Sequence, residues 1–160
     1  MMISSWTAEE EAFTFDLQKV MPFPRLTTNE VYYRCQLSAY NLGIHNLHRN
    51  INVMNVWDET VASRVANEIG SCLAHYCLER AAEGVQYITA YSDACGGQNR
   101  NRKMVLMWMH ICNISEVQEI NHKFMTSGHS YLPNDSDFGL IERETRKNCA
   151  LHPRTVLKSH

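Results

Sequence analysis

The sequence lacks the features that mark several specialised classes of protein. The formal net charge is −2, so no global positive charge draws the chain to nucleic acid, and such contacts must come from local patches. The longest apolar run, Met104 to Met109, is far too short to span a bilayer, so we expect no membrane partner. There is no internal repeat and no low-complexity segment. With 44% hydrophobic and 20% charged residues, the 160 residues predict one globular domain with a single core.

Cysteine motifs are also missing. The chain has six cysteines, but no two of them are spaced C-x-x-C, so a zinc knuckle is not supported. The first residues, M-M-I-S-S-W-T, lack the basic region and the apolar run of a signal peptide. We therefore expect reduced and mostly buried thiols in place of disulfides.

One stretch, Tyr87 to Asn101, combines several informative features in the order Y-I-T-A-Y-S-D-A-C-G-G-Q-N-R-N. An apolar run typical of a buried strand ends at a single acid, Asp93, and two glycines follow before a polar segment opens an apolar helix. A carboxylate at a strand end beside a Gly-Gly turn is a common way to present a metal ligand or a catalytic acid on a rigid element. A turn or cap residue is the simpler alternative for Asp93.

Periodicity predicts the other elements. Alternation indicates strands at 12–17, 31–44, 51–57, 85–92 and 120–127, and helical spacing indicates helices at 60–82, from Asn99 or Asn101 to 113, and from Asp135, Ser136 or Asp137 onward. The M-P-F-P-R-L segment between the first two strands is predicted to be an extended connector, because its prolines lack the N–H that a ladder needs. The second helix is apolar nearly all the way round, which predicts that it is buried between layers.

The resulting order is β-β-β-α-β-α-β-α. Three early strands are most simply antiparallel, and the later strands, which alternate with helices, are most simply parallel. This order predicts an α/β fold of the ribonuclease H-like type, with a five-stranded mixed sheet and helices on both faces. The core would span 12–148, with tails at 1–11 and 149–160.

Three acids occupy comparable positions in that architecture. Asp16 ends the first strand, Asp93 ends the fourth, and Asp137 begins the last helix, so the three can converge at one edge of the sheet. Such carboxylates repel one another unless a cation joins them, and Mg²⁺ or Mn²⁺ prefers oxygen ligands. Two ions roughly 3.5 to 4 Å apart can activate an attacking oxygen in phosphodiester chemistry. Asp135 and Glu142 are alternatives for the third acid.

Other residues could support such a site. Gln98 could contact a phosphate or close the turn after Asp93, and His129 could order a carboxylate or a phosphate or be a structural histidine. Two basic clusters could bind the DNA backbone or simply be solvated: Arg100, Arg102 and Lys103 in the first, and Arg143, Arg146 and Lys147 in the second.

Several words of the sequence resemble a family of uncharacterised domains that is common in transposon-derived animal proteins. They include F-D-L-Q-K-V-M-P-F-P-R-L, Y-S-D-A-C-G-G-Q-N-R-N and G-H-S-Y-L-P-N-D-S-D-F-G-L-I-E, within roughly 13–147. That family is similar to the catalytic core of cut-and-paste (DDE) transposases, which use three acidic residues on a ribonuclease H-like fold. The resemblance implies that Asp16, Asp93 and Asp137 are the metal-binding triad, with Gln98 and His129 near it.

The resemblance implies a function and a location. We expect a magnesium-dependent DNA cleavage and strand-transfer core, with DNA as its partner, in the nucleus; a homo-oligomer is compatible with the sequence. No zinc finger or helix-turn-helix is evident, so we expect an isolated core. The alternative is an inactive transposon remnant that binds DNA or another protein and tolerates the loss of Asp93.

Overall fold

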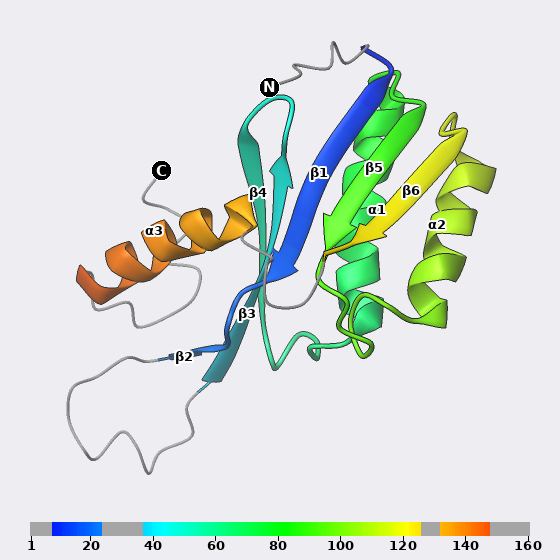
Figure 1. The fold of residues 1–160 in the computed structure, drawn as a ribbon. Coiled ribbons are helices and arrows are strands. Elements are labelled where there is room, and N and C mark those ends of the chain that lie inside the picture. Colours follow the sequence, from blue (N-terminus) through cyan, green and yellow to red (C-terminus); the bar gives the residue numbers. More distant parts are fainter. Residues whose placement is uncertain (1–7, 24–36, 126–131, 148–160) are drawn as a thin grey trace.

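A computed structural model describes residues 8–23, 37–125 and 132–147 of the chain. Its elements follow the order β-β-β-β-α-β-α-β-α (Figure 1). Their bounds are β1 Glu10–Leu17, β2 Met21–Phe23, β3 Leu37–Asn46, β4 Ile51–Asp58, α1 Ala66–Ala82, β5 Tyr87–Ser92, α2 Arg102–Ile114, β6 Glu119–Phe124 and α3 Pro133–Lys147. None of the helices in these ranges is long and apolar enough to cross a membrane.

The strands within the described ranges form one mixed sheet of six strands. β3 pairs antiparallel with β1, β2 and β4, whereas β5 pairs parallel with both β1 and β6. The expected antiparallel pairing of the early strands and parallel pairing of the later strands is therefore confirmed. An α/β architecture is confirmed as well.

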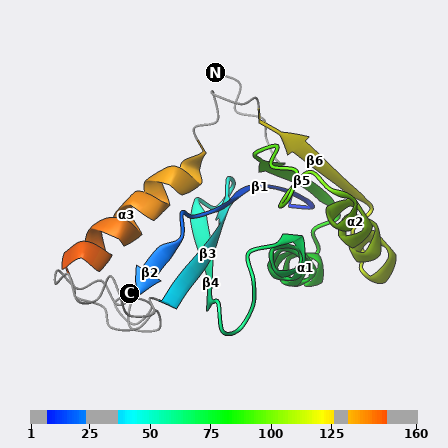
Figure 2. The same cartoon turned by 90° about the horizontal axis from the view of Figure 1, so that it is seen from below.

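The two faces of the sheet carry different helices. Along β1, Phe13, Phe15 and Leu17 are buried in a core shared with α1 and α2, while the alternate residues point to α3. Figure 2 shows α1 and α2 on one side of the sheet and α3 on the other. Helices on both faces therefore leave β1 buried on both sides, which is why its burial pattern is almost continuous.

Several elements differ from their predicted ranges. Met21–Phe23 forms β2, a sixth strand, because Pro22 lies opposite Ser38 in a strand only three residues long, where a missing N–H is tolerated. Helix α1 begins at Ala66 and not at Thr60, since Thr60 is held in a turn by the Asp58 side chain. The predicted strand at 31–44 is observed from Leu37 onward, and its first residues lie outside the described ranges.

The prediction that the second helix is buried all round is wrong. Met104, Trp108 and Ile111 of α2 are buried, but Val105, Leu106 and Met109 are 57%, 63% and 58% exposed. The reason is tertiary: α2 packs beside α1 and next to β6, at one end of the sheet, so no further layer covers its outer face in the described part of the chain (Figure 2). Its N-cap is Asn101, one of the two predicted residues.

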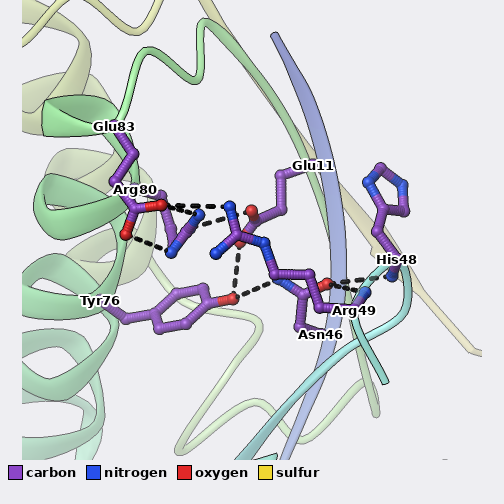
Figure 3. A network of polar contacts seen from close by, with 7 residues as sticks. All are labelled: Glu11, Asn46, His48, Arg49, Tyr76, Arg80 and Glu83. Atoms are coloured by element: carbon purple, nitrogen blue, oxygen red, sulfur yellow. Dashed lines mark hydrogen bonds and ion pairs between the residues drawn. The ribbon is translucent and has the colours of Figure 1, made fainter. Parts of the chain in front are cut away.

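A buried ionic network ties the start of β1 to α1 (Figure 3). Glu11 is 4% exposed and accepts hydrogen bonds from Tyr76 Oη at 2.6 Å and from Arg80 Nε at 3.0 Å. Arg80 also donates to Glu83, and Asn46 donates to Tyr76 Oη. Buried charges are tolerated only when they are paired and hydrogen-bonded, so this network holds β1, β3 and α1 in one arrangement.

The cysteines in the described ranges are less buried than expected: Cys77 is buried, whereas Cys72, Cys95 and Cys112 are half-buried. Cys72, Cys77, Cys95 and Cys112 are free. Burial raises the pKa of the Cys77 thiol, which keeps it protonated and unreactive.

Candidate functional site

Asp16 and Asp93 lie at the carboxyl ends of neighbouring strands. β1 and β5 are parallel, with Thr14 opposite Tyr91, so Asp16 and Asp93 come level two residues further on. Side chains two residues apart share a face, which places Asp16 with Thr14 on the α3 side. Asp16 is half-buried and accepts a hydrogen bond from the backbone N–H of Leu17 at 2.8 Å.

Asp93 is held by the turn that follows it. Its Oδ1 accepts from the Asn99 side-chain amide and from the backbone N–H of Cys95. Asn99 is 3% exposed, and its own backbone N–H bonds to Cys95 O at 2.8 Å. The turn therefore folds back on Asp93 and points the first residues of α2 toward the end of β5.

The start of α3 is docked over β1 and β3. Asn134 is fully buried; it donates to the backbone oxygen of Gly43 at 2.9 Å and accepts from the Thr14 hydroxyl. Phe138, one turn later, packs where a side chain at Gly43 would be, since a Cβ there would lie 2.8 Å from its ring. A glycine at this position lets the helix approach the sheet closely.

The docking of α3 places the three candidates for the third acid in different surroundings. Asp137 points to β3, where its Oδ2 lies 2.8 Å from His45 Nδ1. Asp135 is exposed on α3 and interacts electrostatically with Asp16, and it also accepts a hydrogen bond from the Leu132 N–H in the manner of a capping box. Glu142 lies two turns further on, with Oε1 3.5 Å from Gln18 Nε2. Of the three candidates, Asp135 is therefore the one whose charge acts on Asp16, whereas Asp137 is paired with His45.

Burial and neighbouring charges change the pKa of Asp16. The pKa of Asp16 is raised to about 6, chiefly by burial; the hydrogen bond from Leu17 works against this, and the charges of Asp93 and Asp135 add to it. Arg64, in the loop before α1, lowers that pKa in part. Its Nε is buried without a hydrogen-bond partner in the described ranges. The negatively charged form of Asp16 is therefore disfavoured here unless more positive charge is placed beside it.

A chain of hydrogen bonds reaches Asp93 from the other face of the sheet. Trp108 Nε1 donates to His122 Nδ1 at 3.2 Å, His122 Nε2 lies 2.9 Å from Ser92 Oγ, and Ser92 Oγ donates to the Asp93 backbone oxygen at 2.8 Å. An indole N–H can only donate, so Nδ1 must accept and the proton must be on Nε2. Burial lowers the pKa of His122 to about 4, consistent with a neutral ring.

The remaining predicted residues are dispersed. Arg100, Arg102 and Lys103 are exposed around the start of α2, near Asp93 in the chain, whereas Arg143 is exposed on α3. Gln98 is half-buried in the turn after Asp93, where its backbone oxygen accepts from the Asn101 side chain. His129 and the side chains of Arg146 and Lys147 lie outside the described part of the structure.

Three contributors were not predicted as site residues. Arg64 lies in a loop with no recognisable motif, and Asn134 is one polar residue in a polar segment. His122 lies in a strand whose neighbours are mostly exposed, so alternation did not single it out. Each acts through a contact distant in the sequence, which local patterns do not report.

The donor set fits a hard divalent cation, because it consists of carboxylate oxygens. Among residues 8–23, 37–125 and 132–147, however, no three His, Cys, Asp or Glu side chains are already grouped closely enough to hold a metal ion. Magnesium typically uses one or two carboxylates with substrate phosphates, so a preassembled trio is not required. Comparison of the chain with family models, curated proteins and solved structures found no match.

Proposed function

We propose that this domain is a ribonuclease H-like core, derived from a transposase, that cleaves or transfers DNA phosphodiester bonds with Mg²⁺ or Mn²⁺. The observation that carries the proposal is that Asp16 and Asp93 lie at the ends of neighbouring parallel strands, at a sheet edge where the charge of Asp135 also acts on Asp16. The pairing of the strands, antiparallel for β1, β3 and β4 and parallel for β1, β5 and β6, supports a ribonuclease H-like fold.

Within this proposal, Asp16 and Asp93 are the central ligands. Each uses one carboxylate oxygen in the hydrogen bonds described above, so the second oxygen can turn toward a shared cation. A bound divalent cation would polarise the phosphodiester and lower the pKa of an attacking water or 3′-hydroxyl. Asn99 and the Leu17 N–H orient the two carboxylates, and Arg64 supplies positive charge beside Asp16.

We assign the third acid to Asp135. Asp137, the residue implied by the family resemblance, is engaged by His45, and Glu142 lies two turns along α3. Asp135 is exposed and its charge acts on Asp16, so in this proposal it is the third ligand of a cation that a DNA phosphate also contacts. The exposed arginines and lysine around the start of α2 would hold the DNA backbone, which predicts salt-sensitive binding.

Calorimetric titration with Mg²⁺ and Mn²⁺, with and without duplex DNA, tests the proposal. Wild type should bind, Asp93→Asn and Asp135→Asn should lose binding, and Asp137→Asn, the matched control, should retain it. If Asp137→Asn loses cation binding and Asp135→Asn keeps it, the third acid is Asp137 and not Asp135. If wild type binds no cation even with DNA present, the catalytic proposal fails and an inactive DNA- or protein-binding remnant is the better account.

A further inference from the structure

A hollow between the start of α2 and β6 lies close to Asp93 but opens on the opposite face of the sheet. Its volume is about 550 Å³, within the range of small-molecule sites. The inner lining includes Met104, Trp108 and His122, and Leu106 and Phe124 form its more exposed walls. The hollow is therefore mainly apolar and has flat aromatic groups within it.

The rim is polar and positively charged. Arg100 and Arg102 line the hollow together with Asn99 and Asn101, and none of the described residues that line it is acidic. The guanidinium of Arg100 lies over the Phe124 ring, 5.8 Å from its centroid. A wholly apolar ligand would not use the arginines, and an inorganic anion would not use the apolar walls. The complementary ligand has a flat apolar part and a negative charge.

The hollow is connected to the acidic site in two ways. Asn99 lines it and donates to the Asp93 carboxylate. Trp108 and His122 line it and bond, through Ser92, to the Asp93 backbone. A ligand seated there would lie beside the end of β5, with its charged group at the Arg100 rim.

We propose that this hollow binds one unpaired nucleotide of the DNA substrate, with its base among Leu106, Trp108 and Phe124 and its phosphate at Arg100 and Arg102. The inference rests on the proposed function, because it takes DNA as the substrate and adds that the DNA carries an unpaired nucleotide beside the cleavage site. Aromatic rings and arginines at a basic groove are the usual means of binding unpaired bases.

Fluorescence anisotropy with labelled DNA duplexes in EDTA tests this independently of catalysis. A duplex with one unpaired 3′ nucleotide should bind about tenfold more tightly than the blunt duplex, within the range that one stacked base contributes. Leu106→Glu should abolish this preference, while Met109→Glu, which changes an equally exposed residue of α2 outside the hollow, should keep it. Arg100→Ala should weaken binding of the unpaired duplex more than Lys103→Ala, since Lys103 does not line the hollow.

A competition experiment tests whether the hollow recognises a nucleotide or only its phosphate group. A deoxynucleoside monophosphate should displace the unpaired duplex at lower concentration than inorganic phosphate does. Equal affinity for blunt and unpaired duplexes, equal effects of Leu106→Glu and Met109→Glu, or equal competition by phosphate would overturn the inference. If the preference for the unpaired duplex is present but calorimetry shows no cation binding, the pocket stands and the catalytic proposal fails.

Discussion

Trp108 donates its indole N–H to Nδ1 of His122 across 3.2 Å, and this single contact determines the tautomer of a histidine at the base of the candidate site. Because Nδ1 is an acceptor, Nε2 carries the proton toward Ser92, the residue before Asp93. The ring also packs against Phe15 and Phe124. Protonation of Nδ1 would break the contact with Trp108, so the ring must remain neutral for the arrangement to persist.

His122 should therefore make stability depend on pH. Its pKa falls from 6.5 to about 4 on folding, so its contribution is complete above pH 6.5 and is lost as the pH falls toward 4. Because the ring is partly accessible, we expect about 1–2 kcal/mol over this window, below the value of an unscreened shift. In an Asp16→Asn background, urea unfolding of His122→Phe should show a flatter pH profile, whereas the exposed-site control His110→Phe should keep the slope of that background. An identical slope in both variants would contradict the prediction.

Asp16 should have the opposite pH dependence. Its pKa rises from 3.8 to about 6 on folding, so the folded state binds more protons and stability is lost as the pH rises through this window. At pH 7, Asp16→Asn should stabilise the protein by about 1–3 kcal/mol, because an uncharged amide avoids the burial cost and the repulsion from Asp93 and Asp135. Thermal unfolding at pH 4 and pH 7 measures this, and the gain should be absent at pH 4. If Asp16→Asn is instead less stable than wild type at pH 7, favourable interactions in wild type outweigh the cost of burying the Asp16 carboxylate.

The two titrations overlap between pH 4 and 6 with opposite signs. Wild type should therefore show a nearly flat profile there, and the His122 effect is measured most clearly in an Asp16→Asn background. If the Asp16 cost is relieved by a cation, 10 mM Mg²⁺ should stabilise wild type more than Asp16→Asn. If Mg²⁺ stabilises wild type and Asp16→Asn equally, the cation does not bind at Asp16.

The close approach of α3 to Gly43 predicts that replacing this glycine by alanine lowers stability, whereas the same change at a less crowded glycine does not. Gly43→Ala puts a methyl group 2.8 Å from the Phe138 ring and 3.0 Å from the Asn134 amide, so it should cost about 1–3 kcal/mol by displacing the helix. In the matched control, Gly70→Ala, the nearest atoms are 3.8 Å away and the residue is inside α1, so it should gain about 0.5–1 kcal/mol. Denaturant unfolding compares them, and a neutral Gly43→Ala would mean that α3 is not closely packed.

The Glu11–Arg80 pair predicts a large single-site effect. Arg80→Met leaves the Glu11 carboxylate buried with Tyr76 as its remaining partner in the network, which should cost about 3–5 kcal/mol. Arg49→Met removes the exposed pair with Glu83 and should change stability by less than about 1 kcal/mol. Thermal unfolding of the two variants gives the comparison; equal small effects would show that the buried pair contributes little.

Local patterns in the sequence were sufficient for most elements and for part of the site. Alternation of β-forming residues located β1, β4 and β5, and an asparagine side chain that satisfies a free N–H located the start of α2. The order of strands and helices indicated which pairs are antiparallel and which are parallel. It also indicated that Asp16 and Asp93 lie at one edge of the sheet, and the structure adds that their strands, β1 and β5, are neighbours.

Other features depended on contacts that no local pattern contains. The choice between Asp135 and Asp137 follows from how α3 is rotated over the sheet, and Asn134, Gly43 and Phe138 set that rotation from positions about 90 residues apart. The prediction that α2 is buried all round was wrong because periodicity measures apolarity and does not reveal whether another layer covers the helix. The sequence alone thus determined most of the elements and their order, and only the tertiary structure decided which side chains meet, because those contacts depend on packing between distant segments.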